Sequence, residues 1–190
     1  GQGIADQIMI EDGETIPDPH VWLSPPLAKM EVENIANGLI SADPANASYY
    51  KNNKEILFAK LSDLDQKYLS GLNNCQKKDV VTSHAAFSYL ARAYDLNQVP
   101  ILGLSPEDDP SPKRLAEIAD FAKNNNVKYI FFETLVSPKL AETIAKTTGA
   151  QTLELNPIEG LSNAQIAHGE NYVTEMERNL DNLRTALECQ

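Results

Sequence analysis

The stretch Lys78-Asp79-Val80-Val81-Thr82-Ser83-His84 begins the alternation of short apolar runs and amphipathic segments that decides the fold. Its first five residues are typical of a short β-strand, and the residues over 86–94 are typical of an amphipathic helix. Three further strands are predicted over 99–104, 127–132 and 151–155, with helices between them. Strands that alternate with helices in this way indicate an α/β domain with a four-stranded parallel sheet flanked by helices.

The ends of the predicted strands place several polar side chains at one edge of that sheet. Ligands of open parallel sheets bind beyond the carboxyl ends of the strands, and His84 comes directly after the first of them. We take His84 as a candidate ligand, with the acidic residues that follow the other strands as its candidate partners: Glu107, Asp108, Asp109, Glu133 and Glu159. The run over 107–109 lies in a proline-rich segment and is expected to be a solvated surface loop.

A long helix is predicted upstream of the sheet. Asp43-Pro44 is a helix-start signal, and neither Gly nor Pro occurs from 45 to 70. Apolar residues recur at steps of three and four on one face: Leu57, Leu61, Leu64, Tyr68 and Leu72. A helix of this length measures roughly 40 Å, so we expect it to cross a whole domain or to bridge two. Gly71 and Asn73-Asn74 are expected to end it.

The stretch Asp18-Pro19-His20-Val21-Trp22-Leu23-Ser24-Pro25 contains the single Trp of the chain and one of its three His. Ser24-Pro25 is a capping signal for a helix over 25–40, whose apolar residues share one side: Leu27, Ile35 and Leu39. His20 is therefore fixed between a proline turn and an aromatic ring just before a helix. A histidine held in this way can bind a metal or transfer a proton, or it can simply pack. No element is predicted over 1–16.

The C-terminal part of the chain is predicted to be helical. Ser162 and Gln165 have the spacing of a capping box, and one helix is expected to follow. Its buried face is formed by apolar residues at helical spacing: Val173, Met176, Leu180, Leu183 and Leu187. His168 lies on the polar side of the first turns, where we expect a plain surface residue.

The composition argues against several functions. The chain of 190 residues has a formal net charge of −11, which disfavours binding to nucleic acid or to an anionic membrane surface and fits the attraction of cations. No run is long and apolar enough to cross a bilayer, and residues 1–13 do not resemble a signal peptide. Because the chain does not begin with Met, we expect a mature form or a piece of a longer protein. Cys75 and Cys189 are either a disulfide of an exported protein or two free thiols.

The motifs that are present favour metal binding over covalent catalysis. Two His with a carboxylate are a common ligand set for zinc and other first-row metals, and His20, His84 and an acidic residue of the sheet edge supply it. G-x-S-x-G, G-x-G-x-x-G, P-loop and H-E-x-x-H motifs are absent. A zinc hydrolase is an alternative, with water at an open coordination position and Glu133 as the best candidate for a general base.

Five stretches of the chain resemble one family, and their order and spacing match it as well. They are D-P-H-V-W-L-S-P, V-T-S-H-A-A-F-S-Y-L, G-L-S-P-E-D-D-P-S-P, Y-I-F-F-E and L-N-P-I-E-G-L-S. The family is that of the zinc- and manganese-binding solute receptors of bacterial ABC importers, of the ZnuA and AdcA type, and the resemblance covers about 18–187. It implies two lobes joined by one long helix: here a remnant of the N-terminal lobe over 1–42, the connecting helix over 43–72 and the C-terminal α/β lobe over 73–190.

The resemblance also implies a metal site between the lobes with four ligands. Three of them match His20 in D-P-H, His84 in T-S-H-A-A-F and Glu159 after the last strand. The first, a histidine well upstream of D-P-H, has no match. Asn156, where some relatives carry Asp, is a poorer ligand than Glu159, and we expect Asn156 and Glu133 to support the ligands from behind. Histidine at position 84, where manganese-type relatives commonly carry Glu, favours Zn²⁺ over Mn²⁺.

The function that the resemblance implies is high-affinity binding of Zn²⁺ outside the cytoplasmic membrane and its delivery to the permease of an ABC importer. The expected location is periplasmic or extracellular, as a membrane-anchored lipoprotein in some relatives, and no enzymatic activity is expected. Similarly placed cysteines of relatives pair, so a Cys75–Cys189 disulfide is expected. Alternatives are a manganese receptor or an adhesin of the same family. Apolar surface left exposed by the missing part of the N-terminal lobe is expected to allow a homodimer of the truncated chain.

Overall fold

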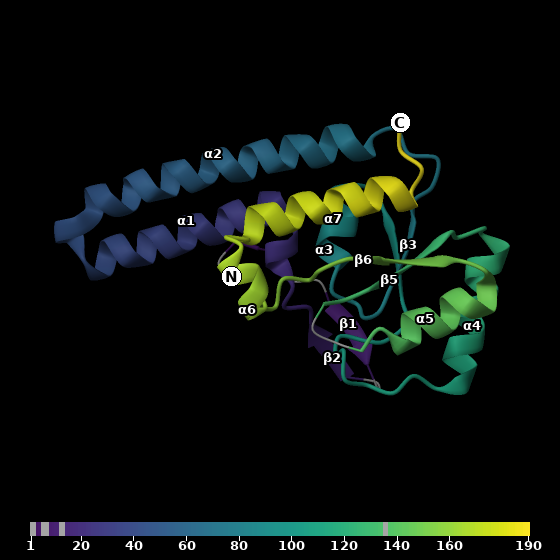
Figure 1. Ribbon diagram of the computed structural model, residues 1–190. Coiled ribbons are helices and arrows are strands. Elements are labelled where there is room, and N and C mark those ends of the chain that lie inside the picture. The colour runs from purple at the N-terminus through teal and green to yellow at the C-terminus, as the bar shows by residue number, and fades with distance from the viewer. Residues whose placement is uncertain (1–2, 5–7, 12–13, 135–136) are drawn as a thin grey trace.

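The structure, a computed structural model, describes residues 3–4, 8–11, 14–134 and 137–190 (Figure 1). Its centre is a four-stranded sheet in which every described pairing is parallel, with the strand order β4-β3-β5-β6. The strands are β3 (Asp79–Thr82), β4 (Asn97–Pro100), β5 (Tyr129–Phe132) and β6 (Gln151–Glu154). The predicted α/β fold with a four-stranded parallel sheet is confirmed.

The two central strands, β3 and β5, are apolar on both faces because helices cover both sides of the sheet. Val81 of β3 pairs in register with Ile130 of β5, and both side chains enter the core on one face. Their neighbours Val80 and Phe131 enter the core on the opposite face. The continuous apolar run that ends at Phe132 thus reflects burial on two sides.

Helices α4 (Pro112–Asn124) and α5 (Lys139–Thr148) cover one face of the sheet, and α3 (Ser88–Ala93) and α7 (Tyr172–Ala186) cover the other (Figure 1). Most of the predicted apolar stripe of the last helix is buried in the core on the α7 face: Met176, Leu180, Leu183 and Leu187, which directly follows the helix. Val173, the first residue of the predicted stripe, is only half-buried. The Ser111 hydroxyl caps α4 by accepting a hydrogen bond from the backbone N–H of Arg114 at 3.1 Å.

Helices α1 (Pro25–Ala42) and α2 (Ala47–Leu72) form a long antiparallel pair joined by a short 3₁₀ turn over Pro44–Asn46. The 26 residues of α2 correspond to about 39 Å, which confirms the predicted long helix. Its C-terminal half packs on α7, where the Tyr68 hydroxyl donates to the Met176 carbonyl at 2.8 Å. Its other half extends with α1 beyond the sheet (Figure 1).

The α1–α2 pair corrects one expectation. Ile35 and Leu39 share one side of α1, as expected, and are 62% and 44% exposed, because among the described residues only α1 and α2 line the groove that they face. Gly71 was expected to end α2, but it lies inside the helix. A Cβ atom at Gly71 would approach side-chain atoms of Leu180 and Arg184 to 3.2 Å. Glycine there allows α2 and α7 to approach closely.

Three further expectations differ from the structure. A hairpin of β1 (Ile8–Glu11) and β2 (Glu14–Pro17) occupies part of 1–16, where no element was predicted; residues 1–2, 5–7 and 12–13 lie outside the described residues. Strand β4 lies over Asn97–Pro100 rather than 99–104, because backbone pairing with β3 sets its register and the apolar residues after it are buried in a bend. The predicted single last helix is interrupted between α6 (Asn163–Ala167) and α7 at Gly169, whose φ of 78° is left-handed.

A disulfide joins Cys75, just after α2, to Cys189, just after α7. This pairing confirms the expectation from the resemblance. The short 3₁₀ helix over Val21–Leu23 precedes α1 and follows His20. None of the helices in the described part of the chain has the length and apolar character needed to cross a bilayer.

Candidate metal centre

His84 is held at the carboxyl end of β3. The chain runs from β3 to β4 on one side and then to β5 on the other, so the ends of β3 and β5 flank the point at which the strand order reverses. Ligands of such sheets bind at this point. The His84 carbonyl accepts hydrogen bonds from the Thr82 hydroxyl at 2.8 Å and from the Gln98 amide at 3.0 Å, and its side chain is fully buried.

Glu133, which follows β5, orients the His84 ring. Its Oε1 atom lies 2.7 Å from Nδ1 of His84 and accepts the backbone N–H of His84 at 3.2 Å. Because a carboxylate accepts hydrogen bonds, Nδ1 carries the ring proton and Nε2 presents its lone pair. Glu133 therefore lies behind the ring, on the side opposite Nε2.

His20 has the same arrangement with a different partner. Oδ1 of Asp18 lies 2.7 Å from Nδ1 of His20 and accepts the His20 backbone N–H at 2.9 Å. Oδ2 of Asp18 accepts a hydrogen bond from the Ser88 hydroxyl, and Asp18 and His20 are both buried. Sequence reasoning missed the role of Asp18. The signal that could have found it is its position two residues before His20 in the D-P-H motif.

Glu159 completes the group from the loop after β6. Its Oε1 atom lies 3.2 Å from Nε2 of His20 and 3.6 Å from Nε2 of His84. One ligand atom from each of the three residues lies within 4.8 Å of the others. Ligand atoms that are about 2.0–2.1 Å from a tetrahedral zinc ion lie about 3.3 Å from one another. The two distances therefore fit ligands that share one ion.

Nε2 of His84 is the atom of this group that most needs a ligand. It is buried and has no hydrogen-bond partner among the described residues, since Oε1 of Glu159 at 3.6 Å is beyond hydrogen-bond distance. Leaving a buried polar atom unsatisfied costs about 1–3 kcal/mol. A metal ion shared with His20 would satisfy it. Two imidazole nitrogens and a carboxylate oxygen are a donor set that suits Zn²⁺.

The electrostatic surroundings of His20 favour a cation. Burial lowers the pKa of His20, but the hydrogen bonds and negative charges of Asp18 and Glu159 outweigh it, so the pKa lies above the ordinary value of 6.5. The same two carboxylates favour a divalent cation at Nε2. Such a cation replaces the proton there, because a metal ligand must be deprotonated.

The other residues singled out in the sequence lie elsewhere. Glu107, Asp108 and Asp109 are in an exposed loop, as expected, and His168 is exposed at the end of α6. Asn156 is buried, but its side chain donates to Glu175 and accepts the backbone N–H of Ile158. Both polar atoms of Asn156 are thus engaged away from the imidazoles.

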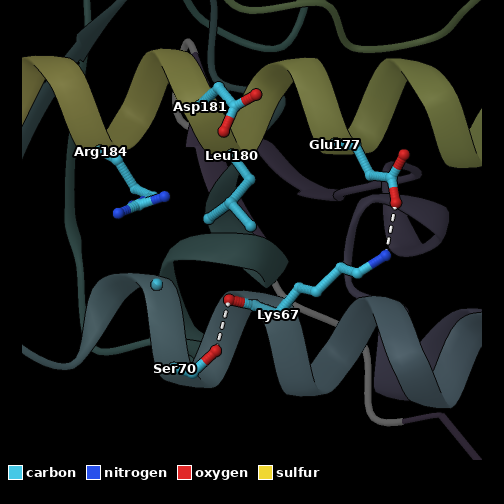
Figure 2. Close-up of a pocket in the computed structure, with 7 residues that line it drawn as sticks. Lys67, Ser70, Glu177, Leu180, Asp181 and Arg184 are labelled. Carbon is cyan, nitrogen blue, oxygen red and sulfur yellow. Dashed lines mark hydrogen bonds and ion pairs between the residues drawn. The ribbon is translucent and has the colours of Figure 1, made fainter.

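A charged groove between α2 and α7 does not include any of these ligands (Figure 2). Its volume is about 430 Å³, and its lysine, Lys67, is already paired with Asp63 and Glu177 at 2.7 Å each. The pair with Glu177 connects the two helices. We therefore interpret this groove as part of a helix–helix contact and not as a ligand site.

The geometry weakens the hydrolase alternative. A general base has to reach a water molecule bound to the ion. Oε1 of Glu133 instead contacts the Nδ1 atom and the backbone N–H of His84, which are turned away from Nε2. Glu133, the best candidate from the sequence, is therefore placed to orient a ligand and not to activate water.

The fold and the site define a class of protein. Two imidazoles, each oriented by a carboxylate, and a partly exposed glutamate meet beside the carboxyl edge of a parallel sheet, which is the arrangement of a metal-binding α/β protein. The chain belongs to the ZnuA family, described as zinc-uptake complex component A, periplasmic, which matches residues 2–186. The family is one of uptake components rather than of enzymes.

Individual relatives agree with this assignment. The chain is 47% identical over 170 residues to the high-affinity zinc uptake system protein ZnuA of Bacillus subtilis (strain 168), a match that covers 90% of this chain and 53% of that protein. The crystal structure of the Zn(II)-bound ZnuA-like domain of Streptococcus pneumoniae AdcA is similar with a TM-score of 0.80 and 42% identity, covering 96% of this chain and 67% of that chain.

A third relative has a second activity in its description. The structure of the laminin-binding protein Lmb of Streptococcus agalactiae, described as bifunctional with adhesin and metal-transporting activity, has a TM-score of 0.82 and 40% identity. The match covers 90% of this chain and 65% of that chain. The chain spans about half the length of the Bacillus subtilis relative, 53%.

Proposed function

We propose that this chain is the zinc-binding part of an extracytoplasmic receptor that captures Zn²⁺ and delivers it to the permease of an ABC-type importer. His20, His84 and Glu159 hold the ion, and Asp18 and Glu133 orient the two imidazoles. The observation that carries the proposal is the buried Nε2 atom of His84, which has no hydrogen-bond partner in the described residues and lies beside Glu159.

The comparisons support the transport role. The family is described as a periplasmic zinc-uptake component, and the Bacillus subtilis relative is named as a zinc uptake protein. We assign residues 1–42 to an N-terminal lobe, 43–72 to the connecting helix and 73–190 to a C-terminal lobe. The long α2 helix, which packs on α7 toward its C-terminal end and on α1 toward its other end, supports this division.

Zinc is favoured over manganese because two of the three ligands are imidazoles. Nitrogen ligands suit zinc, whereas manganese favours carboxylate, carbonyl and water oxygens. Three protein ligands also leave a fourth tetrahedral position. A further protein ligand or a water molecule can occupy it, and an exposed Glu159 at the rim gives the ion a way in and out.

A competitive titration tests the proposal. The metal-stripped chain is titrated with Zn²⁺ and, separately, with Mn²⁺ in the presence of a chromogenic chelator. We expect one Zn²⁺ per chain and much weaker binding of Mn²⁺. His84→Ala should abolish tight binding, whereas His168→Ala, which removes an exposed imidazole, should leave it unchanged. Equal zinc affinity of the wild type and the His84→Ala variant would remove His84 from the site.

A second candidate function is adhesion, and the similarity to the laminin-binding protein Lmb favours it. Binding of the chain to immobilised laminin, measured with zinc and after its removal by a chelator, separates the two roles. Saturable binding that persists without zinc would identify an adhesin surface independent of the metal site. Absence of binding in both conditions would leave metal capture alone.

A further inference from the structure

Glu159 differs from the two histidines in how its side chain is held. Each imidazole has a carboxylate behind it, Asp18 for His20 and Glu133 for His84. In the described parts of the chain, the Glu159 carboxylate has no hydrogen-bond or ion-pair partner except those imidazoles. Its side chain is also 35% exposed. The position of Glu159 must therefore be set by its backbone, in the loop over 156–160.

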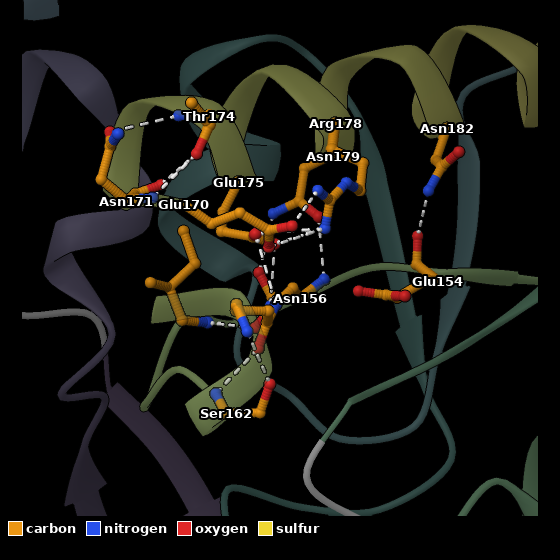
Figure 3. Close-up of polar contacts among 12 residues, drawn as sticks. Glu154, Asn156, Ser162, Glu170, Asn171, Thr174, Glu175, Arg178, Asn179 and Asn182 are labelled. Atoms are coloured by element: carbon orange, nitrogen blue, oxygen red, sulfur yellow. Dashed lines mark hydrogen bonds and ion pairs between the residues drawn. The ribbon is translucent and has the colours of Figure 1, made fainter. Parts of the chain in front are cut away.

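Asn156 anchors the start of this loop (Figure 3). Its backbone N–H donates to Oδ1 of Asn179 at 2.8 Å, and its carbonyl accepts from Nδ2 of Asn179 at 2.7 Å. Its side-chain oxygen accepts the backbone N–H of Ile158 at 2.8 Å, which closes a tight turn just before Glu159. Its side-chain nitrogen donates to Oε2 of Glu175 at 3.1 Å. All four polar groups of Asn156 are thus satisfied.

Glu175 of α7 is a fully buried carboxylate outside the metal-ligand group (Figure 3). It accepts hydrogen bonds from Asn156, from Gln165 at 3.3 Å and from Arg178 at 3.1 Å. Burial raises its pKa, as does the nearby Glu170, and Arg178 and Asn156 oppose this. A buried charge is costly unless it is paired. Glu175 therefore fixes Asn156 firmly, because moving the amide would leave the carboxylate undersatisfied.

The turn that these contacts close is strained. Ile158 has a φ of 56°, in the left-handed region where a β-branched side chain is a genuine outlier. Such conformations persist only where the surroundings over-determine them, and they cluster at ligand-binding positions. Ile158 directly precedes Glu159. Release of the Asn156 contact would let Ile158 relax and move the carboxylate.

A second contact, made by another segment of the chain, holds the same loop. The indole N–H of Trp22 donates to the Pro157 carbonyl at 2.8 Å, and the Trp22 carbonyl accepts the Tyr172 hydroxyl at 2.6 Å. Trp22 lies two residues after His20. The segment that carries one imidazole therefore also holds the loop that carries the glutamate.

We infer that Asn156 and Glu175 are positioning residues for the metal site, which act through the strained turn at Ile158 to hold the Glu159 carboxylate over the two imidazoles. The inference rests on the proposed zinc function and deepens it. The histidines are preorganised by their own carboxylates, and Glu159 is preorganised by the hydrogen bonds of Asn156 to Ile158 and Glu175. Loss of these hydrogen bonds should mainly raise the dissociation rate of Zn²⁺, because the two buried imidazoles of the site are unchanged.

A double-mutant cycle tests this inference on the full chain. The variants are Asn156→Ala, Glu159→Gln and their combination, and the measurements are the Kd for Zn²⁺ by chelator competition and its dissociation rate by stopped flow. We expect Asn156→Ala to raise the Kd about 10-fold, the lower end of the range for groups that orient metal ligands, mostly through faster dissociation. When Glu159→Gln is already present, adding Asn156→Ala should raise the Kd for Zn²⁺ by less than a further factor of about 2, because the effects of residues that act through one another are not additive.

Two further variants separate positioning from folding. Asn182→Ala removes the same kind of contact, an α7 amide donating to a β6 carbonyl at 2.8 Å, but does not touch the loop; it should leave zinc dissociation unchanged. Glu175→Gln keeps the shape of the network and should also speed zinc dissociation. It therefore tests the inference even if Asn156→Ala folds poorly. The inference would be overturned if Asn156→Ala raised the Kd for Zn²⁺ equally in the wild type and in Glu159→Gln. An unchanged rate of zinc dissociation in Glu175→Gln would also overturn it. A wild type that binds no zinc would overturn the proposed function as well.

Discussion

The two histidines of the candidate metal centre are oriented by the same chemistry but by contacts of different range. His20 uses Asp18, which is two residues away on the same loop. His84 uses Glu133, which is 49 residues away and follows the neighbouring strand. In both cases one carboxylate oxygen contacts Nδ1 and accepts the backbone N–H of the histidine itself.

The difference shows which part of the site depends on the sheet. The His20 arrangement is built by a turn of three residues and needs only that the turn dock near the sheet edge. The His84 arrangement exists only when β3 and β5 pair, since Val81 and Ile130 set the register that brings the two strand ends together. The His84 half of the site therefore reports on the fold, and the His20 half reports on local geometry.

Removal of each imidazole should have the largest effects and should separate the two halves. Both His20→Ala and His84→Ala should abolish the zinc-induced stabilisation, which in the wild type amounts to about 2.7 kcal/mol at 100 times the Kd. Without metal, His84→Ala should be the more destabilising, because it leaves the buried Glu133 carboxylate without its imidazole. A lost hydrogen bond to a charged group costs about 1.5–3 kcal/mol.

Thermal unfolding of the metal-free proteins measures this difference. For a chain of this size each kcal/mol corresponds to about 2–4 °C. His20→Ala should lower the Tm less than His84→Ala, because Asp18 keeps the Ser88 hydroxyl as well as a backbone N–H, whereas among the described residues Glu133 keeps only the backbone N–H of residue 84. Equal losses of Tm in the two variants would contradict the distinction between a local half and a fold-dependent half.

Substitution of the orienting carboxylates should have the next largest effect. Glu133→Gln and Asp18→Asn keep the shape of each side chain but weaken the polarisation of the imidazole. The Kd for Zn²⁺ should rise about 10- to 100-fold in each, the range found for groups behind metal ligands. Chelator competition measures both. Asp108→Asn, in the exposed loop, is the matched control and should leave the Kd unchanged.

The two histidines could be selected as candidates from the sequence because the signals that surround them are local. The D-P-H stretch, the capping Ser24-Pro25 and the position of His84 after an apolar run are all visible without the fold. The alternation of strands and helices also predicted the parallel sheet and therefore the edge at which His84 lies. Glu159 was selected from the resemblance, and the structure places it within reach of both imidazoles.

Other features depend on contacts that the sequence does not display. The hairpin of β1 and β2 is an exception, because Asp12-Gly13 between the two paired runs is a sequence signal for a two-residue hairpin turn, and the prediction missed it. Strand β4 was predicted too far toward the C-terminus, because Ile101 and Leu102 are as apolar as strand residues but are buried in a bend. Glu175 and Asn179 each precede a buried stripe residue of α7, which is the only sequence signal for the network behind Asn156.

Lowering the pH should change two properties that depend on His20 in opposite directions: the stability of the metal-free protein should rise and the affinity for Zn²⁺ should fall. The folded-state pKa of His20 is raised, so without metal the stability from its protonated form is fully present below about pH 6.5 and is lost as the pH rises through the folded pKa. Zinc competes with that proton. Its affinity should fall about tenfold for each pH unit below the folded pKa if one proton is displaced.

Titrations with Zn²⁺ at a series of pH values, together with metal-free unfolding curves, measure both trends. Asp18→Asn removes the charge that raises the pKa and should move the pH midpoint of zinc binding downwards. The same variant should reduce the gain in metal-free stability at low pH. A midpoint that stays in place in Asp18→Asn would mean that Asp18 does not govern the protonation of His20.

The smallest effect on zinc affinity should come from Ser88→Ala, which tests the two oxygens of the Asp18 carboxylate separately. The Ser88 hydroxyl donates to Oδ2 of Asp18, whereas the imidazole of His20 contacts Oδ1. Loss of the hydroxyl, which donates to a charged group, should lower stability by about 1.5–3 kcal/mol and change the Kd for Zn²⁺ less than about 2-fold. At Glu133 one oxygen, Oε1, makes both contacts to His84, so no comparable spare contact exists there among the described residues. A large loss of zinc affinity in Ser88→Ala would show that the local half also depends on α3, and the division between the two halves would then fail.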